Sequence, residues 1–335
     1  MKKYYIEVAS GNKAKIDIDE ICRRNGFVNL TKLNFGNGGI GRFLTKIVSV
    51  ANVLLKLKKG DILLLQYPMK KTYKTACRLA HLKGAKVVTI IHDLGAFRRK
   101  KLTPAQENRR LALTDFLIVH NRVMHTYLRE HGYKGGIHDL EIFDYLSNES
   151  PALYDTPHTP WRIVFAGDLR RWRNEFLYKL GTCTSNWAMD MYGKGFEEEN
   201  PSPNVYNHGF TQSDQFIKTV NGDFGLVWDG DSLDECAGSW GEYLKINNPH
   251  KTSFYLRAGI PVIVWSKAAM ATFVKEKNVG IVIDSINELD KKLANISIEE
   301  YESMRKSVSI IGKKLSEGYY FMEGVNKAVR YLQTL

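Results

Sequence analysis

The stretch "NNPHKTSFYLRAGIPVIVW", residues 247–265, places a lysine where a helix begins. Asn248 suits the N-cap and Pro249 the first helical position, so Lys251 falls in the first turn. Gly259 suits the cap at the other end. A helix start repels positive charge, whereas its free amides bind anions. Lys251 therefore predicts a phosphate or diphosphate held between ammonium and amides; the alternative is a lysine extended into solvent.

A second cluster of cations lies in "AGDLRRWRNE", residues 166–175. Gly167 allows a ligand to approach the backbone closely. Arg170, Arg171 and Arg173 offer guanidinium groups, which bind phosphate well. Each arginine is equally well explained as a surface charge.

The elements that position these residues alternate between helices and continuous apolar strands. This pattern is typical of parallel sheets covered on both faces. In the first half we expect strands at 2–9, 61–68, 85–93 and 116–121, and helices at 14–26, 41–60, 71–84 and 122–132. In the second half we expect strands at 161–168, 187–193, 223–229, 260–265 and 281–285, and helices at 174–181, 211–222, 249–259, 269–280, 297–315 and 321–335.

A stretch rich in Ser, Pro, Thr and Asp at 147–160 interrupts the alternation and predicts an interdomain linker. We therefore expect an α/β protein with two doubly wound domains, 1–155 and 160–317. Ligands of such sheets bind at the carboxyl ends of the strands, and the cleft between two such domains is the expected site.

The composition bounds the class of protein. The 335 residues are 44% hydrophobic and 25% charged, as in globular proteins, and no apolar run reaches membrane-spanning length. With no signal-peptide pattern, we expect a cytoplasmic protein, or one at the inner face of a membrane. The four cysteines have no zinc-site spacing, so we expect reduced thiols.

The formal net charge of +12 favours anionic partners. The excess of Lys and Arg in the first half is either a solvated basic face or a peripheral membrane surface. A nucleic-acid partner is not expected, because no motif of that class occurs.

Several motifs together resemble a group of bacterial GT-B glycosyltransferases. This group includes the glucosyltransferases of serine-rich-repeat adhesins and related galactofuranosyltransferases. The most specific motif is "NPHKTS…AGIPVI"; the others are "IVFAGDL", "FGLVWDG", "EYLKINNPHK", "GGIGRF", "QYP", "VTIIHDL" and "IVHNRVM".

The resemblance implies two Rossmann-like domains facing a cleft, with the helix at 318–335 crossing back to the N-terminal domain. It also implies transfer of a hexose, glucose or galactose/galactofuranose, from a UDP-sugar to a hydroxyl of a glycan or glycoprotein, and a homo-oligomer. The alternative is a non-catalytic subunit of this fold that binds glycan or protein for a partner enzyme.

By resemblance, the second domain holds the nucleotide sugar, with the diphosphate on Lys251 and the amides near Thr252. Among the three arginines Arg173 is the preferred phosphate ligand, because its distance along the sequence from Phe176 fits the spacing in the family best. The implied donor site comprises Gly167, Asp168, Arg173, Tyr192, Gly193, Gly209, Phe210, Asp229, Tyr243, Leu244, Asn247, His250, Lys251 and Thr252.

The first domain would face the acceptor. His92 and Asp93 end a buried strand and are candidates for the general base, with His120 a weaker one. The glycine-rich "NFGNGGIGRF" matches neither GxGxxG nor a Walker loop, so it is either a mobile acceptor loop or a plain turn. The acceptor-side candidates are Gly39, Gly41, Arg42 and Gln66.

No cofactor and no metal are expected. In "WDGDSLDE" the glycine is second, whereas an EF-hand loop needs it sixth. The pair Asp229 and Asp231 resembles the Asp-x-Asp motif of metal-dependent glycosyltransferases, yet that motif belongs to a single-domain architecture. Phe254 replaces the second of two glutamates found in many retaining GT-B enzymes, so the pattern does not predict retention.

Overall fold

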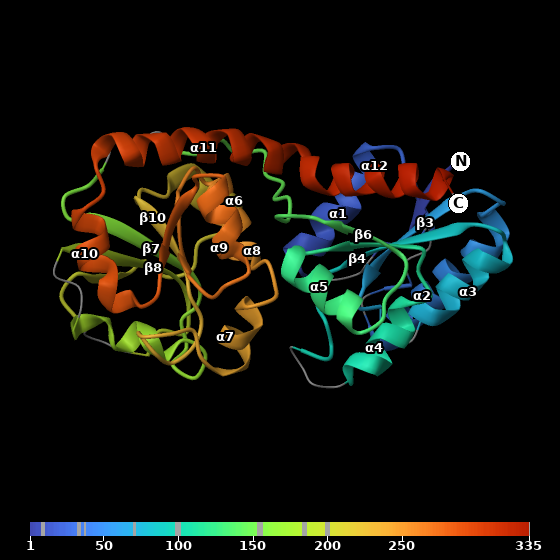
Figure 1. Cartoon of the computed structure of the whole chain (residues 1–335), viewed down its shortest axis with the longest axis horizontal. Coiled ribbons are helices and arrows are strands. Elements are labelled where there is room, and N and C mark those ends of the chain that lie inside the picture. The colour runs from blue at the N-terminus through green and yellow to red at the C-terminus, as the bar shows by residue number, and fades with distance from the viewer. Residues whose placement is uncertain are drawn as a thin grey trace. The chain divides into compact units, whose positions relative to one another are not determined.

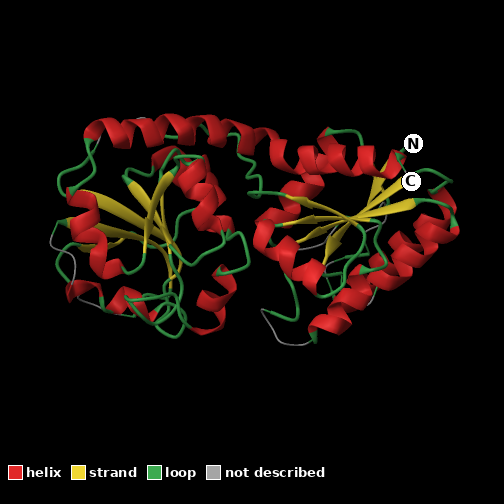
Figure 2. Ribbon diagram, in the orientation of Figure 1, coloured by secondary structure: helices red, strands yellow, loops and turns green. Residues whose placement is uncertain are grey.

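The computed structural model describes residues 1–7, 11–31, 35–36, 38–69, 72–97, 102–152, 157–182, 186–197 and 202–334. The chain divides into two compact units (Figures 1 and 2). Unit 1 comprises Met1–Asp144 and Gly318–Leu335, and unit 2 comprises Tyr145–Glu317. No described helix combines the length and hydropathy of a bilayer-spanning segment.

Unit 1 is built on a parallel six-stranded sheet in the order β2-β1-β3-β4-β5-β6. Strands β3, β4 and β5 are buried on both faces except for the first residue of β4, which is why their sequences are continuously apolar. The elements are β1 (Lys3–Tyr5), α1 (Lys13–Arg24), β2 (Val28–Asn29), α2 (Gly39–Lys56), β3 (Ile62–Tyr67), α3 (Tyr73–Leu82), β4 (Lys86–Ile91), α4 (Pro104–Leu111), β5 (Phe116–Val119), α5 (Arg122–Glu130), β6 (Gly136–Asp139) and α12 (Tyr319–Gln333).

Unit 2 repeats the plan with the order β12-β11-β10-β7-β8-β9. Its core is rich in tryptophan, with Trp187, Trp228 and Trp265 fully buried. The elements are β7 (Trp161–Asp168), η1 (Glu175–Tyr178), η2 (Leu180–Thr182), β8 (Trp187–Lys194), β9 (Val205–Asn207), α6 (Ser213–Thr219), β10 (Phe224–Val227), α7 (Gly238–Leu244), α8 (His250–Arg257), β11 (Val262–Trp265), α9 (Met270–Glu276), β12 (Gly280–Ile283), η3 (Ile286–Glu288), α10 (Leu289–Ala294) and α11 (Ile298–Glu317).

The last helix, α12, belongs to unit 1 although unit 2 precedes it in the sequence. Asp144 fixes its start, because the two carboxylate oxygens accept hydrogen bonds from the amides of Tyr320 (3.1 Å) and Phe321 (2.7 Å). Further along, Tyr331 packs against Phe116 of β5. A buried carboxylate thus holds the start of α12 in unit 1.

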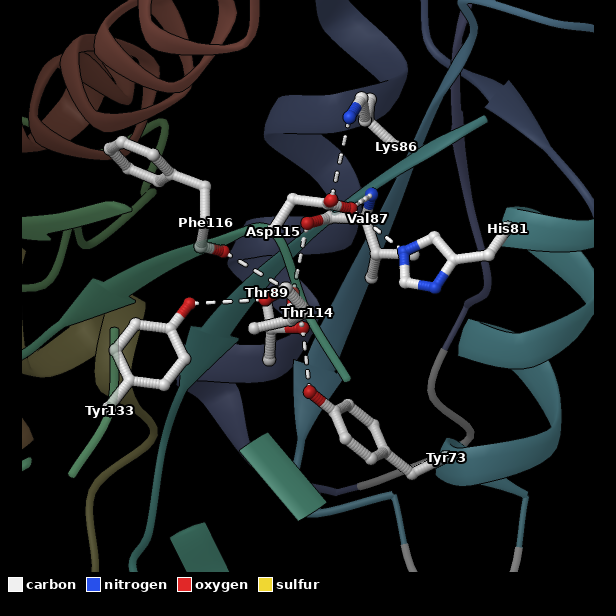
Figure 3. A network of polar contacts seen from close by, with 9 residues as sticks. All are labelled: Tyr73, His81, Lys86, Val87, Thr89, Thr114, Asp115, Phe116 and Tyr133. Atoms are coloured by element: carbon white, nitrogen blue, oxygen red, sulfur yellow. Dashed lines mark hydrogen bonds and ion pairs between the residues drawn. The ribbon is translucent and has the colours of Figure 1, made fainter. Parts of the chain in front are cut away.

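A polar network joins the amino ends of β4 and β5 (Figure 3). Asp115 accepts hydrogen bonds from His81 (2.9 Å) and from the amide of Val87 (2.7 Å). The hydroxyl of Thr114 donates to the carbonyl of Val87, and Tyr133 donates to the carbonyl of Thr114. The network lies at the edge opposite to the carboxyl ends of the strands, so it braces the sheet. Figure 3 also shows Tyr73, Lys86, Thr89 and Phe116.

The predicted α/β class with two parallel sheets is confirmed, but several local predictions were wrong. The helix expected at 174–181 is two 3-10 turns, and the helix expected at 211–222 is the shorter α6, whose N-cap is Gln212. Helix α8 is capped by Pro249, one residue later than expected, so Lys251 is its second residue. Three short strands and three helices were not predicted: β2, β6, β9, α4, α7 and α10.

Parts of the sequence predictions fall beyond the described residues. Cys22, Cys77 and Cys236 are buried free thiols, while Cys183 lies outside the described residues. The same holds for 153–156 of the expected linker and for the side chain of Arg42.

Candidate active site

The topology of unit 2 defines one crevice. Strand β7 lies between β10 and β8, so the chain order reverses between β7 and β10. Ligands of doubly wound sheets bind at the carboxyl ends of the strands at such a switch point. The loop after β7 carries Arg173, and the loop after β10 begins with Trp228 and Asp229 and leads through α7 to α8. Residues from both loops therefore meet there.

Lys251 points into this crevice from the first turn of α8. Its Nζ lies 3.9 Å from Oδ1 of Asp229 and 4.1 Å from the centre of the Phe165 ring. A Cβ on Gly167 would come within 3.2 Å of Nζ, so the glycine makes room for the ammonium. Burial lowers the pKa of Lys251, with Arg173 adding to the effect, whereas Asp229 opposes it.

Arg173 approaches the same carboxylate from the other loop. Its Nη2 donates to Oδ1 of Asp229 at 3.2 Å, and its guanidinium carbon lies 3.4 Å from the centre of the Trp240 ring. Its Nε is buried and has no hydrogen-bond partner within the part of the chain that the structure describes. The other two arginines point elsewhere: Arg170 pairs with Asp168, and Arg171 stacks on Tyr178.

Two more buried polar atoms at the start of α8 have no hydrogen-bond partner among the described residues: Oγ1 of Thr252 and Oδ1 of Asn247. Buried polar groups are nearly always paired, so such atoms indicate a ligand or water. The amide of Thr252, by contrast, donates to the carbonyl of Pro249 at 3.0 Å. This N–H is therefore used within the first turn, and the expected contact of a diphosphate with the amides near Thr252 stays a prediction.

The strand β8 side of the crevice is formed by close backbone contacts. Gly193 is paired with Gly167, and a Cβ on Gly193 would lie 1.9 Å from the Gly167 carbonyl oxygen, so no other residue fits. The amide of Gly193 donates to the carbonyl of Gly209, which has φ +69°. Phe210 is 54% exposed beside Lys194. Phe210 therefore offers an accessible aromatic ring on this side of the crevice.

Other donor-site candidates are more enclosed. The ring of Tyr192 stacks on His208 and meets Phe216 edge-on. His250 stacks on Tyr145 at 4.9 Å. Tyr243 and Leu244 are almost fully buried, and Leu244 belongs to the hydrophobic core. The side chain of Leu244 therefore contributes to the core, and its place in the donor site stays a prediction.

Sequence reasoning missed Trp240, whose ring covers the guanidinium of Arg173. Its signal was an aromatic residue in "GSWGEY" just ahead of a predicted site tyrosine. It also missed Asn174, fully buried, whose side chain donates to the carbonyl of Asp168 at 2.7 Å and so shapes the loop. The neighbouring pocket of about 330 Å³ is lined by Arg171, Trp172, Arg173, Glu175, Gly230, Asp231, Ala237, Gly238, Ser239 and Trp240.

Unit 1 carries a separate polar cluster at the carboxyl ends of β3 and β4. Gln66 donates through Nε2 to Asp19 (2.7 Å) and to the carbonyl of Lys15 (3.2 Å), which fixes the orientation of its amide. Its Oε1 lies 2.7 Å from Nε2 of His92. Because an amide oxygen only accepts, Nε2 of His92 is the donor, and the basic lone pair of the neutral ring is on Nδ1. The ring also stacks on Phe143.

The remaining candidates in unit 1 have different surroundings. His120 is fully buried, and burial lowers its pKa to about 4, so it is a neutral packing residue near neutral pH. Asp93 follows His92 directly beyond β4. Gly39 and Gly41 begin helix α2, so this part of the expected loop is helical. A Cβ on Gly41 would lie 2.3 Å from the carbonyl oxygen of Phe35, which explains the glycine.

Among the described residues, no group of three or more His, Cys, Asp or Glu side chains is placed to hold a metal ion. The charged groups in the unit 2 crevice are instead two cations and one carboxylate, namely Lys251, Arg173 and Asp229. This arrangement is chemically suited to an anionic ligand.

Two doubly wound parallel sheets that follow each other in one chain define the GT-B fold class. In agreement, the structure superposes on the apo form of the lipopolysaccharide outer core galactosyltransferase WaaB over the full length of both chains, with a TM-score of 0.64 at 13% identity. That likeness concerns the fold alone.

The sequence matches the models "Glucosyltransferase 3-like, N-terminal domain" over residues 4–142 and "Glucosyltransferase 3-like, C-terminal domain" over residues 163–328. The chain belongs to this family. It is 31% identical over 327 residues to the beta-1,6-galactofuranosyltransferase WbbI of Escherichia coli K12, covering 97% of this chain and 96% of that protein. It is 24% identical to glucosyltransferase 3 of Streptococcus gordonii, covering 80% and 79%. The protein is a glycosyltransferase, and the non-catalytic alternative is not supported.

Proposed function

We propose that this glycosyltransferase moves a hexose from a UDP-sugar to a hydroxyl group of a glycan or glycoprotein, without a metal ion. The observation that carries the proposal is the convergence of Lys251 and Arg173 on Asp229 at the switch point of unit 2. Two cations against one carboxylate leave a net positive charge for a diphosphate. The buried hydroxyl of Thr252 can donate to the same diphosphate, and the amide oxygen of Asn247 can accept from a hydroxyl group of the nucleotide sugar.

The chemical step follows from these charges. The acceptor oxygen forms a bond to the anomeric carbon while the bond from that carbon to the β-phosphate oxygen breaks, and UDP leaves with the bonding electrons. Negative charge grows on the departing diphosphate, so fixed cations beside it stabilise the transition state more than the ground state. Lys251 and Arg173 supply that charge, which is the part that a divalent metal plays elsewhere.

The acceptor hydroxyl must lose its proton. We assign this role to His92, whose donor contact with Gln66 leaves the basic lone pair on Nδ1. Asp93 is the second candidate. Gly39, Gly41, Arg42 and Gln66 belong to the same unit and are proposed to serve the acceptor side; Gln66 acts there by holding the tautomer of His92.

The donor sugar is proposed to be galactofuranose or glucose, since the relatives reported above carry those two names. The test is a panel of nucleotide sugars screened for thermal stabilisation and for hydrolysis in the absence of acceptor, with and without EDTA. We expect UDP-galactofuranose or UDP-glucose to stabilise the protein and to be hydrolysed equally in EDTA. Loss of hydrolysis in EDTA would refute metal independence, and the absence of any UDP-sugar effect would refute the donor class.

A further inference from the structure

Helix α2 packs on its own domain through one face, where Val50 and Val53 are buried. The same face carries Thr45 and Ser49, both buried, and the hydroxyl of Ser49 donates to the carbonyl of Thr45. Asn52 reaches the carbonyl of Leu30 at 2.9 Å. The polar side chains are thus used inside the unit.

The opposite face carries large apolar side chains exposed to solvent. Ile40 and Leu55 are each 79% exposed, and Phe43 is 56% exposed. The spacing of three and four residues places these side chains on one side of the helix. The α2 apolar face consists of Ile40, Phe43, Leu44, Ile47, Leu54 and Leu55. Contiguous exposed apolar patches of this kind mark a binding surface.

The charge around this face has one sign. From Ile21 to His92 the sequence contains a single acidic residue, Asp61, among many lysines and arginines. Lys46 is exposed on α2 next to this face, and Lys74 and Arg78 lie on α3, which packs beside α2. Within the described residues, none of these three side chains has a carboxylate within ion-pairing distance.

The direction of α2 links this face to the chemistry of unit 1. Helix α2 leads into β3, whose carboxyl end carries Gln66. A helix that connects parallel strands runs antiparallel to them, so Gly39 lies toward the carboxyl edge and Lys56 toward the amino edge. The apolar face thus starts toward the edge of the sheet where Gln66 and His92 meet.

We propose that the α2 apolar face, flanked by the cations of α2 and α3, seats unit 1 on the surface of an anionic lipid bilayer. An apolar stripe with lysines and no acids is the pattern of helices that lie in the membrane interface, where both burial and charge contribute. A second copy of the chain fits less well, because a symmetric contact would bring the same lysines together. This inference does not depend on which sugar the enzyme transfers.

The experiment is co-sedimentation of the full-length protein with vesicles. The vesicles are pure phosphatidylcholine or phosphatidylcholine with 30% phosphatidylglycerol, at low and at physiological salt. We expect binding to the anionic vesicles that weakens with salt, and little binding to the neutral ones. Equal recovery in the supernatant with both kinds of vesicle would overturn the proposal.

Two sets of variants separate the apolar and the charged contributions. Phe43→Gln with Ile47→Gln keeps the charge and removes apolar area, and should weaken vesicle binding at least tenfold. Lys46→Gln with Lys74→Gln should weaken it about fivefold for each charge removed and flatten the salt dependence. The matched control is Ile310→Gln on α11, which is 62% exposed and should bind like the unchanged protein.

Circular dichroism and thermal melting check that the variants fold, which exposed positions should allow. Sedimentation velocity without vesicles provides the counter-test. If Phe43→Gln with Ile47→Gln splits an oligomer but leaves vesicle binding unchanged, the face is a contact between copies and the proposal is wrong. If Ile310→Gln weakens binding as much as the α2 variants do, the α2 face is not the specific surface and the proposal is again wrong.

Discussion

The ammonium nitrogen of Lys251 lies 3.9 Å from a carboxylate oxygen of Asp229. The same oxygen accepts a hydrogen bond from Arg173 at 3.2 Å. One carboxylate therefore orders two cations that come from different loops of unit 2. In the proposed mechanism both cations bind the diphosphate. Asp229 therefore positions the two cations and also competes with the diphosphate for them.

Replacing Asp229 with Asn should tighten UDP binding several-fold. The amide oxygen of Asn can still accept from Arg173, whereas the competing negative charge is gone. Isothermal titration with UDP measures the change, with Asp231→Asn in the same loop as control. Weaker binding in Asp229→Asn than in Asp231→Asn would show that the carboxylate itself contacts the ligand favourably.

His92→Ala should lower kcat by about 10²- to 10⁴-fold, the usual contribution of a general base, and leave UDP affinity unchanged. We expect kcat and UDP affinity to respond differently because His92 belongs to unit 1, whereas the residues proposed to bind the donor belong to unit 2. Steady-state kinetics and UDP titration on the same preparation check it. Full kcat in His92→Ala would show that His92 is not the general base and would favour Asp93.

His120 should make the protein less stable in mild acid. Burial lowers its pKa from 6.5 to about 4, so between these values the unfolded chain binds a proton that the folded state does not. The free energy of unfolding therefore falls as pH drops from 6.5 to 4, by about 3 kcal/mol in total.

Urea unfolding of the unchanged protein and of His120→Leu at a series of pH values isolates this contribution. The difference between the two free energies of unfolding should be constant above pH 6.5 and shift in favour of the variant below it. A difference that does not change with pH would contradict the assignment of His120 as a buried neutral ring.

Asp144→Ala should lower the free energy of unfolding of unit 1 by about 1 to 3 kcal/mol, because two amides at the start of α12 lose their acceptor. Asp144→Asn retains one acceptor and should cost less. Thermal melting and hydrogen exchange of Tyr320 and Phe321 measure the effect. Unchanged protection of those two amides in Asp144→Ala would show that another group caps the helix.

The sequence was most informative where a pattern had one physical explanation. Apolar strands between helices predicted both doubly wound sheets, and the capped lysine of α8 predicted an anion site at one of them. It was less informative about short elements such as β9 and α7, which have too few residues to show a period.

The details of the site depend on contacts between distant residues. Nothing local marks Trp240 as the partner of Arg173, since 67 positions separate them and only the fold brings them to 3.4 Å. Likewise, the family resemblance implied the amides near Thr252. In the structure the amide of Thr252 itself donates to Pro249, and its buried hydroxyl has no partner among the described residues. The chemistry of the site could be predicted from the residue types, whereas the orientation of the side chains could not.

The central claim is that Lys251 holds the diphosphate of the donor. Its direct test is the ratio of UDP to UMP affinity, measured by titration for the unchanged protein, Lys251→Ala and Lys251→Met, with the exposed Lys267→Ala as control. Lys251→Met keeps the packing on Phe165 and removes only the charge. We predict that both Lys251 variants lose about 10- to 100-fold in UDP affinity and much less in UMP affinity, with folding intact. UDP affinity equal to that of the unchanged protein in both variants would contradict the account.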